Sequence, residues 1–293
     1  MPSIDKVSKL FQALAHDDVK AAKELATKIA SREDEKGHHS AARLLRGSLS
    51  NGVHTAGSPT SFLDSALSLR QSPVRLDQVS LPTAMHQQVM ETVNEFRLRS
   101  RLAERQIRRR TKLLFHGPPG CGKSLCAHAL ANEVGLPLYV VRFDSVIGAY
   151  LGQTALNLRQ LFHFAETKQC VLLFDEIDAL GKRRGSSTDV GELDRIVIAL
   201  MQELELSEVQ GFLIATSNLP ETLDLALWRR FDLSLAFPTP PKRDLWKFAS
   251  AKAQSFGIVI RADLREKIGR LKNYADVERE IEDEARRQLL RSL

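Results

Sequence analysis

The feature that most constrains this chain is the stretch Gly117 to Ser124, which reads Gly-Pro-Pro-Gly-Cys-Gly-Lys-Ser. It follows a short apolar run, Leu113 to Phe115, and opens a helical pattern, which is the context that a phosphate-binding loop requires. The glycines let the backbone curl so that successive N–H groups point at phosphate oxygens, and the dipole of the following helix adds positive potential. The stretch therefore predicts a phosphate-binding loop between a buried strand and a helix.

Two side chains of this loop are expected to touch the ligand directly. Lys123 should reach the β- and γ-phosphates, and Ser124 should offer its hydroxyl to Mg²⁺, a hard cation that prefers oxygen ligands. We therefore expect ATP and Mg²⁺ as the bound groups. The residues expected to bind the nucleotide are Gly117, Pro118, Pro119, Gly120, Cys121, Gly122, Lys123, Ser124, Leu125 and Asp175.

Polar residues also follow two further apolar segments. Val171 to Phe174 ends in Asp175 and Glu176, at the strand edge where open α/β sheets bind ligands. Asp175 is the expected Mg²⁺ partner, directly or through water, and Glu176 is placed to orient and deprotonate the attacking water. Asn218 follows Phe212 to Ala215 and is expected to hydrogen-bond that water or a γ-phosphate oxygen.

The bulk composition excludes several classes of protein. Of the 293 residues, 43% are apolar and 27% charged, and no apolar run approaches the roughly 18 residues of a membrane span. Three cysteines without paired spacing suggest neither a disulfide framework nor a zinc site. The first residues space their apolar side chains too widely for a signal peptide, so a cytoplasmic location is expected.

Apolar segments alternate with helical patterns over the middle of the chain, which predicts a three-layer α/β sandwich around a five-stranded parallel sheet. The expected strands are Lys112–His116, Leu138–Phe143, Val171–Phe174, Phe212–Ala215 and Leu233–Phe237. Helices are expected between them at Ser124–Val134, Thr154–Thr167 and Glu192–Leu204. After Pro238 the pattern is helical only, near Pro241–Ser255, Arg261–Leu271 and Asp276–Leu290.

These patterns divide the chain into four parts. Residues 1–50 show helical spacing and are expected to form a small unit that docks on the core or recruits a partner. Residues 51–73, rich in Ser, Gly and Pro, are expected to form a linker. Residues 74–240 form the α/β core and residues 241–293 a short helical lid.

The net charge of +6 is concentrated in one segment. Between Arg97 and Lys112 lie eight basic residues and one acid, so the remainder of the chain is about neutral. A helix is expected from about Thr83 to Arg108, with a stripe of Arg97, Arg101, Arg105, Arg108 and Lys112. Two interpretations of this stripe stay open. In the first, the stripe is a solvated face, or a face that meets a neighbouring subunit or a nucleotide phosphate. In the second, it contacts nucleic acid, although it lacks the interleaved aromatic residues that stack on bases.

Two adjacent arginines, Arg229 and Arg230, precede the fifth expected strand. From that position they are not expected to reach the phosphates of their own subunit. An arginine supplied from a neighbouring subunit stabilises the charge on a transferred phosphoryl group. The alternative is a surface ion-pair cluster.

Together these motifs resemble the AAA branch of the AAA+ ATPases, which includes katanin, spastin and the membrane-anchored AAA proteases. The resemblance covers Val74 to Leu293 and implies a P-loop NTPase fold, ATP hydrolysis and ring or spiral hexamers. It also implies a pore loop, matched by Tyr150, Leu151 and Gly152, that grips a polypeptide in a central pore. The lid segment Tyr274 to Asp276 lacks a second-sensor arginine, as in other members of that branch.

The function expected from this resemblance is an ATP-driven, ring-forming motor that remodels protein substrates. Two alternatives stay open. One is a nucleic-acid-acting loader that uses the Arg97 to Lys112 segment, and the other is a regulatory ATPase that switches a separately encoded partner enzyme, such as a protease. No His-Glu-x-x-His pattern is present, which excludes a fused metalloprotease.

Overall fold

A central sheet positions the predicted ligand-binding residues. The computed structural model describes residues 27–28, 31, 59–71, 73–147, 152–178 and 190–291, with the backbone alone at 59–61 and 190–195. The chain divides into two units, Met1–Ser61 and Phe62–Leu293, and the sheet belongs to the second. Nearly all of the predicted N-terminal helical unit, residues 1–50, lies outside the described residues.

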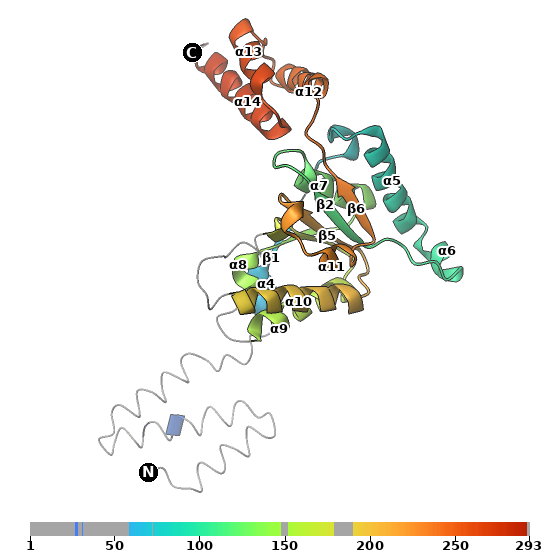
Figure 1. Cartoon of the computed structure of the whole chain (residues 1–293). Helices are drawn as coiled ribbons and strands as arrows, with labels where there is room; N and C mark the ends of the chain where they lie inside the picture. Colours follow the sequence, from blue (N-terminus) through green and yellow to red (C-terminus); the bar gives the residue numbers. More distant parts are fainter. Residues whose placement is uncertain are drawn as a thin grey trace. The chain divides into compact units, whose positions relative to one another are not determined.

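The sheet has six strands in the order β1-β3-β4-β5-β2-β6. The strand β1 pairs antiparallel with β3, and the other neighbours pair in parallel. Figure 1 shows helices on both faces of this sheet, as the three-layer prediction requires. The strands are β1 (Leu67–Arg70), β2 (Lys112–His116), β3 (Leu138–Val141), β4 (Val171–Phe174), β5 (Phe212–Ser217) and β6 (Leu233–Ala236).

Successive residues of the central strands β2, β4 and β5 are buried on opposite faces of the sheet. This explains why apolar residues follow one another in these strands without alternating with polar ones. Leu113 and Phe115 of β2 pack in one hydrophobic cluster, and Leu114 between them packs in the other. Helices α5 (Thr83–Arg97) and α7 (Lys123–Val134) cover the first face. Helices α9 (Gln153–Thr167) and α10 (Val190–Leu206) cover the second (Figure 1).

The sheet gains a strand that the sequence did not predict. Residues 59–70, assigned to a linker, form helix α4 (Pro59–Ala66) and the edge strand β1 (Leu67–Arg70). Pattern analysis missed β1 because it is short and exposes its last two residues, so it lacks the buried apolar run of the parallel strands. It adds an antiparallel edge and leaves the five parallel strands in place.

The expected single helix from Thr83 to Arg108 is wrong. The structure has two helices, α5 (Thr83–Arg97) and the short α6 (Arg99–Glu104), and residues 107–111 have no regular structure. Gln106 follows the C-cap residue of α6 and has a positive φ of 59°. This value lies outside the right-handed helical region, so the helix does not continue. The remaining short elements are η1 (Leu76–Gln78), α8 (Phe143–Val146), η3 (Pro220–Thr222) and α11 (Leu225–Trp228).

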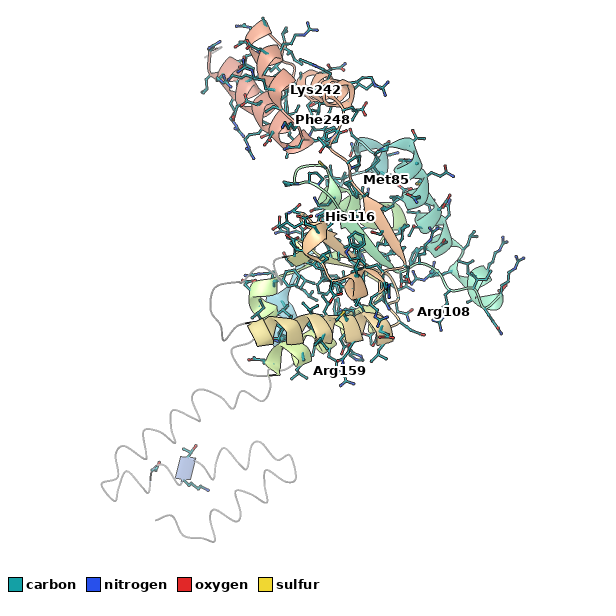
Figure 2. All side chains as sticks on the ribbon, viewed as in Figure 1. Met85, Arg108, His116, Arg159, Lys242 and Phe248 are labelled. Carbon is teal, nitrogen blue, oxygen red and sulfur yellow. The ribbon has the colours of Figure 1, made fainter. Side chains whose placement is uncertain are left out.

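The predicted basic stripe is therefore not one continuous helical face. Lys112 is a buried residue of β2 whose Nζ donates to the Leu204 carbonyl. Arg97 pairs with Glu133 at 2.9 Å. Arg108, labelled in Figure 2, is exposed. A stripe inferred from helical spacing fails here because the second helix ends at Glu104, before the last three members of the stripe.

The lid follows β6 and has a hydrophobic cluster of its own. It consists of α12 (Lys242–Ser255), α13 (Ala262–Arg270) and α14 (Tyr274–Arg291), close to the expected bounds. Its cluster includes Leu245, Leu264 and Ile281, one from each helix. None of the helices that the structure describes combines the length and apolarity needed to span a membrane.

Candidate functional site

Strand order brings the predicted site residues to one edge of the sheet. β5 lies between β2 and β4, with Thr216 opposite Phe115 and Ala215 opposite Phe174. The carboxyl ends of these three parallel strands therefore meet. The phosphate-binding loop leaves β2, the acid pair leaves β4, and Asn218 follows β5.

The loop has the backbone that its glycines were expected to allow. Gly117 and Gly120 have φ values of 136° and 73°, a region that side chains strongly disfavour. A Cβ on Gly117 would lie 2.1 Å from the Phe237 carbonyl oxygen, so glycine is also required by close packing. Lys123 opens α7 and is buried, with its Nζ donating to the carbonyls of Gly117 at 2.7 Å and Pro118 at 2.8 Å.

Electrostatics at Lys123 act in two directions. Burial lowers the pKa of its ammonium group, whereas the nearby carboxylates of Asp175, Asp178 and Glu176 oppose that shift. His116, at the end of β2 and labelled in Figure 2, has a pKa lowered by burial and by the charge of Lys123. The carboxylates that follow β4 thus favour the charged form of Lys123.

Three oxygens converge beside the loop. Ser124 Oγ donates to Asp175 Oδ1 at 2.8 Å, and Thr216 Oγ1 donates to the same oxygen at 2.6 Å. Hydroxyl and carboxylate oxygens are the ligands that Mg²⁺ prefers, and it keeps several waters beside them. These donors fit a magnesium ion that Ser124 and Asp175 would hold, and the ion would neutralise charge on the phosphates.

Glu176 is held beside Asp175 in an unusual conformation. Its φ is 56°, a left-handed value uncommon for residues other than glycine, and such values cluster at functional sites. Its N–H donates to Thr216 Oγ1 at 2.8 Å, and its Oε1 accepts from Asn218 Nδ2 at 2.9 Å. Asn218 is itself fixed by its N–H, which donates to Asp178 Oδ1 at 3.1 Å.

These residues line a cavity of about 850 Å³, large enough for a nucleotide. One end holds the loop, the acid pair and Asn218. The other end has apolar walls from two sources: Val74 and Val79, which precede α5, and Phe248 and Ala251 of the lid helix α12. Figure 2 labels Phe248. The predicted binding residues Pro119 to Leu125 and Asp175 all border this cavity.

Two contributors to the site were not found from the sequence. One is Thr216, whose hydroxyl joins Asp175 to the backbone of Glu176. Its signal was present, since it is a polar residue at the end of the strand before Asn218, but strand order was needed to interpret it. The other is Tyr274, which was noted as part of the lid and borders the cavity; no local pattern predicts which lid side chains face the loop.

The two predicted arginines differ in their surroundings. Arg230 is half-buried and forms an ion pair with Glu205 at 2.9 Å. Arg229 is exposed, and its guanidinium group makes no hydrogen bond or ion pair with the described residues. Neither arginine is among the described residues that line the cavity. Arg229 is thus the one whose charge is available to another molecule.

The two arginines directly follow helix α11 (Leu225–Trp228), and this segment is attached to the strand that precedes the loop. Trp228 of α11 packs edge-on against His116, with ring centroids 4.7 Å apart. Asp232 Oδ2 accepts the backbone N–H groups of Thr111 and Lys112, each at 2.8 Å. Both ends of β2 therefore hold the arginine-bearing segment. Of the predicted pore loop, Gly152 precedes α9 with a φ of 83°, and Tyr150 and Leu151 lie outside the described residues.

The arrangement has the groups that hydrolysis of a nucleoside triphosphate requires. A loop of N–H donors with Lys123 can bind the phosphates, and the Ser124 and Asp175 oxygens can hold a metal ion. The Glu176 carboxylate, oriented by Asn218, can align a water molecule and accept its proton. These roles are predictions for the individual residues, which the geometry brings within reach of one cavity.

Comparison with known proteins identifies the family. Residues 113–239 match the family described as "ATPase family associated with various cellular activities (AAA)". The uncharacterized AAA family ATPase y4kL of Sinorhizobium fredii is 34% identical over 264 residues, covering 87% of this chain and 79% of that protein.

Further relatives match a shorter part of this chain. The peroxisomal ATPase PEX6 of Candida glabrata is 36% identical over 166 residues, which are 54% of this chain and 16% of that protein. PEX6 of Arthrobotrys oligospora is 36% identical over 184 residues, again 16% of its length. The motifs, the sheet order and these matches agree: the chain belongs to the AAA family of ATPases and hydrolyses ATP.

Proposed function

We propose that this ATPase assembles into a ring, a hexamer as its family resemblance implies, and uses Mg²⁺-dependent ATP hydrolysis to remodel protein substrates in the cytoplasm. The observation that carries the proposal is an incomplete site. The described cavity residues include the loop lysine, the acid pair and Asn218, but no arginine. Arg229 meanwhile is exposed, with no partner for its charge among the described residues.

An arginine supplied by a neighbouring subunit would explain both observations, the cavity without an arginine and the exposed Arg229. It would meet charge that develops on the transferred phosphoryl group, an effect on the order of 10³–10⁵ in rate where it is known. Arg229 is the better candidate because Arg230 is already neutralised by Glu205. In this proposal Arg230 fixes the position of α11, and Arg229 crosses to the neighbour.

Remodelling of protein substrates rests on the resemblance of Tyr150, Leu151 and Gly152 to a pore loop. Gly152 has a left-handed backbone with open space around its Cβ position, so it is a sharp turn before α9. In this proposal the aromatic side chain of Tyr150 contacts an extended substrate chain.

Mixing two inactive variants tests the shared site. Glu176→Gln should bind ATP without hydrolysing it, and Arg229→Ala should lack the charge that its neighbour needs. In a mixed ring, the Glu176→Gln subunit supplies Arg229 to the intact site of the Arg229→Ala subunit. Mixing should therefore restore turnover, to about a quarter of wild type if the two variants associate at random.

The matched control is Arg229→Ala mixed with the double variant Glu176→Gln, Arg229→Ala. That mixture has intact sites but no crossing arginine, so it should stay inactive. Turnover is measured as phosphate release at equal total protein. If Arg229→Ala alone hydrolyses ATP at the wild-type rate, or if the active mixture shows no recovery although the two variants co-assemble, the shared-site proposal is wrong.

A further inference from the structure

The lid touches the phosphate-binding loop through the first turn of α14. The backbone N–H groups of Tyr274 and Ala275 both donate to the Gly120 carbonyl, at 3.0 and 3.3 Å. The first N–H groups of any helix have no partner within the helix. Here a carbonyl of the phosphate-binding loop supplies that partner, so the loop completes the N-terminus of a lid helix.

Side chains fit this junction closely. A Cβ on Gly120 would lie 2.7 Å from Asn273 Oδ1 and 3.1 Å from the Ala275 Cβ, so only glycine leaves room for the contact. Asn273 caps α14, because its Oδ1 accepts the Asp276 N–H at 2.8 Å. The Tyr274 ring packs edge-on against Phe248 of α12, with centroids 5.1 Å apart.

The junction also reaches the segment before α5. Burial raises the pKa of the Tyr274 hydroxyl, while the neighbouring Ser80 side chain lowers it by hydrogen bonding. Ser80, Tyr274 and the loop residue Cys121 all border the nucleotide cavity. Three parts of the chain therefore border the cavity beside the loop.

The planar peptide between Gly120 and Cys121 gives this contact its significance. In a trans peptide the C=O and N–H bonds point in opposite directions. Because the Gly120 carbonyl is directed at α14, the Cys121 N–H is directed away from the lid. N–H groups of this loop are the expected phosphate donors, so one rigid plane would join phosphate to lid.

We propose that the Gly120–Cys121 peptide couples the bound phosphates to the lid, with Tyr274 and Ala275 as positioning residues that act through it. A phosphate that holds the Cys121 N–H fixes the carbonyl against α14, and a docked α14 in turn preorganises the loop for phosphate. The coupling is reciprocal, as thermodynamic linkage requires. It needs no arginine in the lid, and Tyr274 to Asp276 supplies none.

Charged side chains of the lid explain the coupling less well. Lys252 borders the cavity but is paired with Glu278, Nζ to Oε1 at 2.5 Å. Lys247 also borders the cavity. If one of these lysines contacted the phosphates directly, nucleotide affinity would depend on the charge of that lysine. Loss of the contact between Gly120 and α14 would then leave nucleotide affinity unchanged. A test of the backbone contact therefore leaves both lysines in place.

Two substitutions at one position separate the backbone contact from the side-chain contact. Tyr274→Ala removes the ring and keeps the N–H, whereas Tyr274→Pro removes both. Proline is favoured at the first position of a helix, where its fixed φ fits and the lost N–H has no helical partner. In this helix the Tyr274 N–H does have a partner, the Gly120 carbonyl, and the Cδ of proline would occupy the place of its hydrogen. The difference between the two variants therefore measures the loss of the Tyr274 N–H together with displacement of the Gly120 carbonyl from α14.

ADP affinity and amide hydrogen exchange of residues 275–278, with and without ADP, are measured on the full chain. In wild type and Tyr274→Ala, ADP should slow exchange at this turn. In Tyr274→Pro the slowing should disappear, and the Kd for ADP should rise about threefold to tenfold relative to Tyr274→Ala.

The matched control is Ala262→Pro, which places proline at the first position of α13. Ala262 is exposed and follows the extended residue Arg261, so the backbone suits proline there. It should change neither readout. If Tyr274→Ala and Tyr274→Pro have equal ADP affinity and equal ADP-dependent protection, or if ADP does not alter exchange in wild type, the proposal is overturned. The result does not depend on ring assembly, since both readouts report binding within one chain.

Discussion

At the scale of single residues, Thr216 shows how much of the site depends on one hydroxyl group. The side chain is 1% exposed, at the end of the strand between the loop and the acid pair. It donates to Asp175 and accepts the N–H of Glu176. It therefore orients the carboxylate expected at the metal and also stabilises the left-handed backbone of the expected base.

Replacing Thr216 by valine keeps the shape of the side chain and removes this hydroxyl. We expect ATP turnover and the apparent affinity for Mg²⁺ to fall by about 10–100-fold, as is usual when a group that orients a metal ligand is lost. Turnover measured across a Mg²⁺ titration checks this. Thr216→Ser retains the hydroxyl and should recover most of the activity.

Thr92→Val is the matched control. Thr92 is also 1% exposed, and its hydroxyl donates to the Gln88 carbonyl within α5, away from the site. It should leave the Mg²⁺ dependence unchanged. Equal losses in the two variants would show that Thr216 acts through packing alone.

At the scale of elements, the segment from Arg97 to Lys112 carries most of the net charge, and the fold uses much of it internally. Arg109 donates to the carbonyls of Gly211 and Val209, each at 3.0 Å, and lies over the Phe96 and Phe212 rings. Arg110 binds Glu95 through both its side chain and its N–H. The segment therefore binds the residues just before β5 and, through Lys112, the end of α10.

The ion pair of Glu95 and Arg110 makes stability depend on pH. Burial alone would raise the pKa of Glu95, but hydrogen bonds from Arg110 and its charge hold that pKa below the ordinary value. A lowered carboxylate pKa stabilises the fold above the ordinary glutamate value of about 4.3, and this contribution is lost as pH falls through the lowered pKa.

Glu95→Gln should therefore lower the Tm by roughly 2 °C near neutral pH, for a contribution of about 0.5–1 kcal/mol. The difference from wild type should vanish in acid, and thermal unfolding scans from neutral pH downward measure it. Glu266→Gln is the control, since Glu266 and its partner Arg270 are both largely exposed. A Tm difference that persists unchanged in acid would contradict the ionic explanation.

The contacts of these basic residues within the fold limit how many of them could bind nucleic acid. Arg97, Arg99, Arg109, Arg110 and Lys112 have partners within the fold. This leaves the arginines at 101, 105 and 108 as the candidates for phosphate contacts. Each phosphate neutralised contributes about −0.9 to the slope of log K against log salt. We expect the slope for binding to DNA or RNA to be no steeper than about −3, and we expect no stimulation of ATPase activity. A steeper slope together with stimulation would favour the loader.

At the scale of the whole molecule, strong local patterns predicted most of the core. The central strands β2, β4 and β5 were found because they are buried on both faces, and the ends of β2 and β4 were located to the residue. What failed depends on tertiary contacts. β1 is stabilised by pairing with β3, and the end of α5 is decided by the path of the chain back into the sheet. The contact of α14 with Gly120 joins residues too far apart for any local pattern to reveal.

The proposed threading of protein substrates makes a prediction for the assembled molecule. If Tyr150 grips an extended chain, unfolded casein should stimulate ATP turnover, because engagement of substrate is coupled to hydrolysis around the ring. Tyr150→Ala should abolish that stimulation, whereas Tyr150→Phe, which keeps the aromatic ring, should retain it. The measurement is the ratio of turnover with casein to turnover without it. A ratio that stays high in Tyr150→Ala would reject the pore loop. A ratio of one in wild type would favour a regulatory ATPase, whose work is done on a specific partner and requires no grip on an unfolded chain.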